Sequence, residues 1–116
     1  YLQQARYEER AERWLEAARS YSRAADGMLS DAQVQSKAAE AMWKANLDLR
    51  KAAEYAKRAL ALDSNNPEYH VILGKIYLAA GLVLNARREL ELANELSPND
   101  ATIAKLLEAV RKGGTA

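Results

Sequence analysis

The sequence contains no cysteine and no phenylalanine, and it has a single histidine, His70, among 116 residues. Without cysteine there can be no disulfide scaffold, no thiolate zinc or iron–sulfur site and no thiol catalysis. One histidine also excludes a two-histidine metal site within one chain. We therefore expect no bound metal and no cofactor.

A large charge excess and a long apolar run are also missing. The chain has 17 Lys+Arg against 16 Asp+Glu, a formal net charge of +1, which disfavours a dedicated nucleic-acid binder. No segment approaches the roughly 20 apolar residues of a membrane span, and no signal peptide is evident. We expect a cytoplasmic protein without a membrane partner. The first residue is Tyr1 rather than Met, which suggests a fragment of a longer protein.

Glycine and proline are scarce, with five and two copies, while alanine occurs 24 times. Alanine, leucine, glutamate, arginine and lysine all favour helix. No alternating apolar pattern bounded by turns resembles a strand. The composition therefore predicts an all-α fold whose helices approach closely, because alanine leaves little between the backbones.

Punctuating residues divide the chain into helices of similar length. The clearest breaks are residues 63–67 and 97–100, whose Asp, Ser and Asn side chains suit helix N-caps. Gly81 and Asn46 tolerate the left-handed conformation that ends helices, and residues 26–31 mark an earlier connection. The pattern predicts seven helices, over residues 2–11, 13–27, 31–45, 48–63, 67–80, 83–96 and 99–112. The links are short, so successive helices should pack antiparallel.

The chain also repeats itself with a period near 34 residues. A shift of 34 aligns Leu49 with Val83, Ala52 with Ala86, Ala59 with Ala93 and Trp43 with Tyr77. A shift of 35 aligns Trp14 with Leu49, Ala17 with Ala52 and Ala24 with Ala59. Helix pairs that cannot bury their own apolar face must stack, so we expect a short superhelical array.

Residues 67–100 resemble a tetratricopeptide repeat (TPR). They carry, at the family's spacing, Leu73, Gly74, Tyr77, Gly81, Ala86, Leu90, Ala93 and Pro98. His70 stands where the family often has tryptophan, and Leu90 where it often has an aromatic residue. The resemblance implies a right-handed α-solenoid of antiparallel helix pairs. The repeats would span about 1–31, 32–66 and 67–100, followed by a capping helix at about 99–112 and a flexible tail at 113–116.

Small residues recur where the paired helices should cross most closely. A larger side chain there would force the backbones apart. The structural repeat positions are Ala17, Ala24, Ala52, Ala59, Gly74, Tyr77, Ala86, Ala93 and Pro98.

The first helix of the middle repeat has two possible registers. Either Ala39 or Glu40 takes the small-residue position, depending on whether one residue is inserted near Leu47. Without the insertion Trp43 aligns with Tyr77 and is buried; with it, Trp43 turns by about 100° into the groove. We favour burial.

No enzyme motif is present, and we expect no catalytic residues. There is no phosphate-binding glycine loop, no G-x-S-x-G and no H-E-x-x-H. The acidic residues interleave with Lys and Arg at helical spacings, which is typical of a solvated face. His70 occupies a packing position. The basic pairs of the second helices, Arg50-Lys51, Lys57-Arg58 and Arg87-Arg88, are read as solvated surface rather than as a nucleic-acid site.

The TPR resemblance implies that first helices line an inner, concave groove that binds extended or helical peptides. The groove candidates are Lys37, Ala41, Lys44, Val71, Lys75 and Leu78. Three lysines among apolar side chains suit an acidic or amphipathic peptide. A TPR subclass holds the acidic C-terminus of chaperones with a Lys–Asn clamp. Ala41 replaces the clamp's Asn here and Val71 a possible Lys, which disfavours that role.

The sequence therefore predicts a non-catalytic protein-interaction module that belongs to a larger protein. One alternative is a structural module that self-associates or serves as a rigid spacer. Another is a co-chaperone-type domain of a multidomain bacterial protein, which rests on analogy at the level of the fold.

Overall fold

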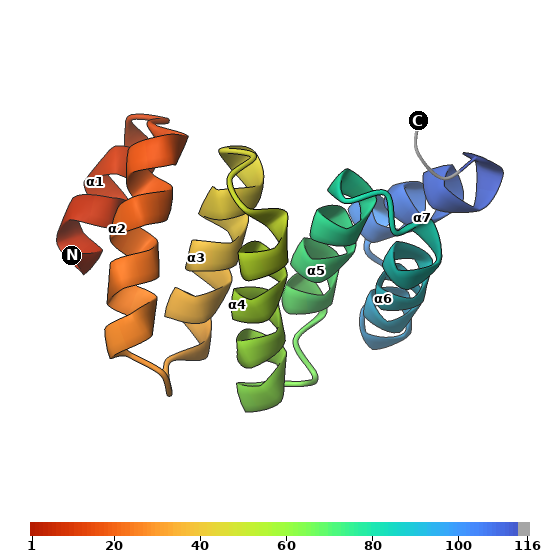
Figure 1. Ribbon diagram of the computed structural model, residues 1–116. Helices are drawn as coiled ribbons and strands as arrows, with labels where there is room; N and C mark the ends of the chain where they lie inside the picture. Colours follow the sequence, from red (N-terminus) through yellow and green to blue (C-terminus); the bar gives the residue numbers. More distant parts are fainter. Residues whose placement is uncertain (114–116) are drawn as a thin grey trace.

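The computed structural model describes residues 1–113, which form seven α-helices and no strand (Figure 1). The all-α prediction and the number of helices are confirmed. The helices are α1 (Leu2–Arg10), α2 (Trp14–Gly27), α3 (Ala32–Lys44), α4 (Leu49–Leu62), α5 (Pro67–Ala79), α6 (Val83–Leu96) and α7 (Ala101–Gly113).

Side chains cap the N-termini of α3, α4, α5 and α7. The Asp31 carboxylate accepts from the Val34 amide at 3.1 Å, and Asn66 accepts from Glu68 at 3.0 Å directly before Pro67. These contacts satisfy amide groups that the helix itself leaves unpaired. Asp100 caps the last helix in the same way, so α7 begins two residues later than predicted.

Gly113 is the last residue of α7, so the predicted tail at 113–116 begins one residue too early. Residues 114–116 lie outside the described part of the chain.

The helices stack as three pairs, α1 with α2, α3 with α4 and α5 with α6, and α7 packs against α6. Neighbouring pairs are joined by contacts of α2 with α3 and of α4 with α5, and α3 also contacts α5. The stack measures 39 × 26 × 23 Å and runs from α1 at one end to α7 at the other (Figure 1). One alanine-rich core runs from Ala5 to Ile76. A smaller cluster of Leu90, Leu107 and Val110 lies between α6 and α7.

Seven of the nine predicted structural repeat positions are buried, and these seven are the small residues. Six are buried alanines: Ala17, Ala24, Ala52, Ala59, Ala86 and Ala93. Gly74 is buried as well, whereas Tyr77 is half-buried and Pro98 is exposed in the turn before α7. A Cβ atom at Gly74 would lie only 3.1 Å from Leu90 Cγ and 3.5 Å from the Ala86 carbonyl oxygen.

Buried polar residues near the start of α3 and α5 bind carbonyl groups at or just after the end of the preceding helix. The buried Gln35 amide donates to the Ala25 oxygen at 2.7 Å and to the Met28 oxygen at 3.1 Å. His70 lies 35 residues later and is also buried, with Nδ1 2.9 Å from Glu89 Oε1 and Nε2 2.9 Å from the Ser64 oxygen. Both side chains hold a connection between helix pairs, which agrees with a packing role for His70.

A left-handed residue follows each first helix and defines the register of the repeats. These residues are Glu12, Asn46 and Gly81, with φ of 57°, 52° and 79°. Asn46 lies 34 residues after Glu12 and Gly81 lies 35 after Asn46, so the middle repeat is one residue longer. The extra residue is Asp48, which has φ 46° and caps α4. The Leu47 amide donates to the Met42 oxygen as the Leu82 amide does to Tyr77, so Met42, and not Trp43, matches Tyr77.

The close approach at Gly74 gives a direct test of the packing. Gly74→Leu forces α5 and α6 apart, and we expect it to destabilise the fold by about 1–3 kcal/mol. The matched control is Gly27→Leu, since no atom lies within 4 Å of a Cβ built at Gly27. Thermal unfolding followed by circular dichroism should show a lower Tm for the first variant only. Equal Tm values for both variants would contradict this packing.

Candidate binding face of the first helices

The side of the stack formed by α1, α3 and α5, here called the first-helix face, carries the three lysines expected to bind a ligand. Lys37 and Lys75 are half-buried, and Lys44 is exposed. Each lysine already has a partner within the fold. Their partners define what the face can offer to a ligand.

Lys37 belongs to a polar cluster that joins the first three helices. Its Nζ lies 3.1 Å from Glu9 Oε2 of α1 and 3.9 Å from Glu40 Oε1 of α3. The Tyr21 hydroxyl of α2 donates a hydrogen bond to the other oxygen of Glu9. Lys37 therefore links α3 to α1.

Glu9 is kept ionised by this cluster. Partial burial raises the pKa of its carboxyl, but hydrogen bonds from Tyr21 and Lys37 outweigh that effect and lower the pKa below 4.5. Burial and the same hydrogen bond to Glu9 raise the pKa of Tyr21, so its hydroxyl remains a donor.

The other two lysines lie over tryptophan rings. Lys44 Nζ is 4.2 Å from the centre of the Trp14 ring, and Lys75 Nζ is 5.1 Å from that of Trp43. Such cation–π contacts orient the ammonium group and leave N–H donors available. Within residues 1–113 neither lysine forms an ion pair.

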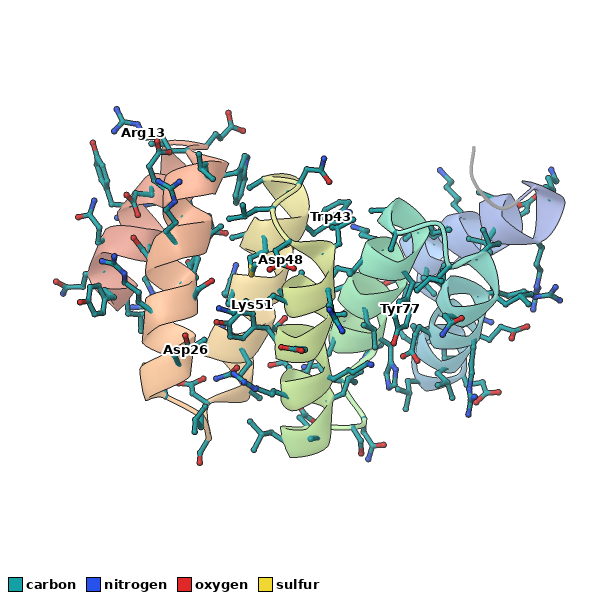
Figure 2. The ribbon with its side chains drawn as sticks, viewed as in Figure 1. Arg13, Asp26, Trp43, Asp48, Lys51 and Tyr77 are labelled. Carbon is teal, nitrogen blue, oxygen red and sulfur yellow. The ribbon has the colours of Figure 1, made fainter. Side chains whose placement is uncertain are left out.

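Trp43 is only partly buried, although the sequence favoured burial, and it packs in part against the core. Trp43 is half-buried at the end of α3, on the side toward α5 (Figure 2). Ala39 and Met42 are buried in the core instead. The extra residue Asp48 explains this register, because it moves Trp43 one position away from the match with Tyr77.

Three apolar candidates serve packing in whole or in part. Ala41 is 1% exposed and lies in the core, so the expectation that it lines a groove is wrong. In the corrected register Ala41 matches the buried Ile76. Val71 and Leu78 are partly buried against the cluster between α6 and α7, so less of each side chain is free to contact a ligand.

Two depressions hollow the first-helix face. The one between α1 and α3 has a volume of about 520 Å³. It is lined by Arg6, Glu9, Arg10, Glu12, Trp14, Tyr21 and Lys37. The second, between α3 and α5, has a volume of about 320 Å³. It is lined by Gln33, Ser36, Lys37, Glu40, Asn66, Glu68, Tyr69 and Ile72.

Sequence reasoning missed Arg6, Glu40 and Trp14 as residues of this face. The signal was present in the repeat, because Arg6, Glu40 and Lys75 are separated by 34 and 35 residues, as are the three left-handed turn residues. Recognising the extra residue at position 48 would have found Arg6 and Glu40, whereas Trp14, at the start of α2, gave no such signal.

The described residues contain no group of three His, Asp or Glu side chains placed to hold a metal ion. No helix within residues 1–113 combines the length and the apolar character needed to cross a membrane. The face itself presents lysines, tryptophan rings and the paired carboxylate of Glu9.

The Glu9 cluster predicts a pH dependence of stability. Because folding lowers the pKa of Glu9, its contribution is complete above pH 4.5 and is lost as the pH falls through the lowered pKa. Glu9→Gln should unfold more easily than wild type at neutral pH, and the difference should shrink in acid. Denaturant unfolding at pH 7 and pH 3 measures both. A difference that is the same at the two pH values would contradict this role of the carboxylate.

Comparison with known proteins gives a consistent picture of the fold. No protein-family model matches the sequence, and a search of curated proteins finds no significant match. Among solved structures, the TPR domain of Arabidopsis OM64 superposes with a TM-score of 0.86 at 17% identity, over 96% of this chain and 91% of that one. The first TPR domain of Spaghetti (RPAP3), solved with an HSP90 peptide, has a TM-score of 0.85 at 17% identity, over 95% and 86%.

A third similar structure is the Yersinia enterocolitica secretion chaperone SycD, solved with a peptide of the translocator YopD. It has a TM-score of 0.81 at 16% identity, over 93% of this chain and 87% of that one. At such identities the likeness concerns the fold, which is that of the TPR domains: an all-α solenoid of stacked helix pairs.

Proposed function

We propose that this chain is a protein-interaction module that binds a segment of a partner protein along the first-helix face. The observation that carries the proposal is the Trp43–Lys75 pair, a half-exposed ring beneath an ammonium group that forms no ion pair within residues 1–113. The similar structures of RPAP3 and SycD were each solved with a peptide of another protein, which supports a binding role for this fold.

The chemistry of the face favours a segment that is both acidic and apolar. Lys44 and Lys75 each present donors to a carboxylate while resting on a ring. The rings supply apolar area at little cost in conformational entropy, as binding anchors commonly do. The lysines steer an acidic segment toward the face, and apolar contact contributes most of the affinity.

The first-helix face does not suit a clamp for a terminal carboxylate. Ala41 is buried, so it cannot contact a carboxylate as a clamp residue would. Glu40 lies 3.9 Å from Lys37 and would repel an incoming carboxylate. The proposed partner segment therefore binds near Trp43 and Lys75, away from the Lys37 cluster.

The double variant Trp43→Ala, Lys75→Glu should lose its partner and remain folded, because both side chains are only half-buried. Affinity capture from a lysate of the source cells, with circular dichroism of each variant, measures this. The control is Lys105→Glu, which reverses the charge of an exposed side chain on α7. Losing one central anchor typically raises Kd at least tenfold. A partner captured equally by both variants would exclude the first-helix face as its site.

Self-association is a second candidate function, and Tyr7 is the observation that favours it. Tyr7 on α1 is 53% exposed, whereas the matching residues Ala41, Ile76 and Val110 of the later first helices are at most 5% exposed. A second copy that packed on α1 would cover this side chain.

Sedimentation velocity over a range of concentrations distinguishes this candidate. If copies associate through α1, the wild type should sediment faster as concentration rises, and Tyr7→Arg should remain monomeric. Leu29→Arg is the control, since Leu29 is similarly exposed, at 60%, but lies after α2. A wild type that stays monomeric throughout would exclude self-association.

A further inference from the structure

The opposite side of the stack, formed by the second helices α2, α4 and α6, carries two grooves that the proposed function does not use. The groove between α2 and α4 has a volume of about 350 Å³. It is lined by Arg19, Ser22, Arg23, Asp26, Met42, Leu47, Asp48 and Lys51. Figure 2 shows Asp26, Asp48 and Lys51 along this gap.

The second groove, beside α4 on its other side, has a volume of about 360 Å³. It is lined by Leu49, Arg50, Ala53, Glu54, Lys57, Ile76, Tyr77, Ala80 and Leu82. Its floor is apolar, with Ile76 fully buried and Tyr77 half-buried, and Leu82 at its edge is 47% exposed. An apolar side chain from a partner would bury this surface.

Helix α4 forms the ridge between the two grooves, and the ridge is basic. It carries four cations, Arg50, Lys51, Lys57 and Arg58, against one acid, Glu54. Arg58 pairs with Asp26 at 3.6 Å. The other three cations form no ion pair among the described residues.

The two acids that border the first groove, Asp26 and Asp48, already have partners within the fold. Asp26 also accepts a hydrogen bond of 2.8 Å from the Tyr55 hydroxyl, and the Asp48 carboxylate caps the Lys51 amide at 3.1 Å. The second groove itself is lined by two cations, Arg50 and Lys57, and one acid, Glu54, so the ridge presents a net positive charge beside the apolar floor.

We propose that this second groove, between α4 and the C-terminal end of α5, forms a second docking surface together with the α4 ridge, and that it takes an acidic amphipathic helix of a partner protein. An apolar side chain of that helix fills the space between Ala53, Tyr77 and Leu82, and its carboxylates lie against Arg50 and Lys57. Helices commonly bind in grooves with apolar residues three or four positions apart. The module then binds two protein segments at once, one on each side of the stack.

The apolar floor favours a protein segment over nucleic acid, because nucleic-acid affinity comes mainly from phosphate contacts with Lys and Arg. The charge favours a partner over a second copy of this chain, since two basic α4 ridges brought together would repel each other.

The experiment uses ¹⁵N-labelled protein and the peptide acetyl-(Glu-Glu-Leu-Leu)₃-amide as the probe. We expect its addition to shift the amide resonances of Ala53, Tyr77 and Leu82. The same peptide with lysine in place of glutamate should bind far more weakly. Leu82→Asn should raise the Kd of the acidic peptide at this groove about tenfold, as loss of an apolar anchor commonly does.

The matched control is Leu62→Asn, because Leu62 is 46% exposed but lies at the other end of α4. Asparagine suits the Leu82 position, which is the N-cap of α6, and Leu62 is an exposed residue in the last turn of α4. Circular dichroism checks that both variants fold. The double variant Trp43→Ala, Lys75→Glu should keep binding at the groove, which separates this surface from the first-helix face.

Several results would overturn the proposal. These are no shift at the groove, shifts confined to the first-helix face, or equal binding of the lysine peptide. Stronger groove shifts with a labelled oligothymidylate would make this a nucleic-acid surface. Concentration-dependent dimerisation lost in Leu82→Asn, without peptide binding, would make it a contact between copies.

Discussion

The close approach of α5 to α6 at Gly74 is the constraint on which the stack depends. A Cβ atom at Gly74 would lie only 3.1 Å from Leu90 Cγ, and the core between the other helices is built largely from buried alanines. Small residues let the backbones come together, so that each pair presents one continuous surface to the next. The first-helix face and the α4 ridge are both built from helix pairs that pack through small residues.

One residue decides which side chains the first-helix face presents. Asp48 adds a position to the turn between α3 and α4, and its carboxylate then caps α4. The register of α3 shifts by one relative to the second helices. As a result Ala41 enters the core, and Trp43 comes to lie within cation–π distance of Lys75.

The fold could be predicted well from the sequence because its signals are local or periodic. Asp, Asn, Gly and Pro mark the helix ends, and alanine at a period near 34 marks the crossings. The site could be predicted only in part. Lys37, Lys44 and Lys75 lie on the first-helix face, and their role in binding stays a prediction. A single inserted residue left two registers for Trp43, and alignment by residue type favoured the wrong one.

The Glu9–Tyr21–Lys37 cluster could not be foreseen for a different reason. It joins side chains from three helices whose relative rotation depends on the whole stack. The outer grooves were missed in the same way. The basic pairs of α4 were visible in the sequence, but the apolar floor beside α4 comes from Ile76 and Tyr77 of α5.

The most direct test of the binding face is NMR of the tryptophan side chains with a captured partner, because the chain has only two tryptophans. Two indole N–H resonances are expected, from Trp14 and Trp43. If the first-helix face is the binding site, adding the partner should shift the Trp43 indole resonance as the complex forms. A complex that forms while the Trp43 resonance stays unchanged would contradict the account.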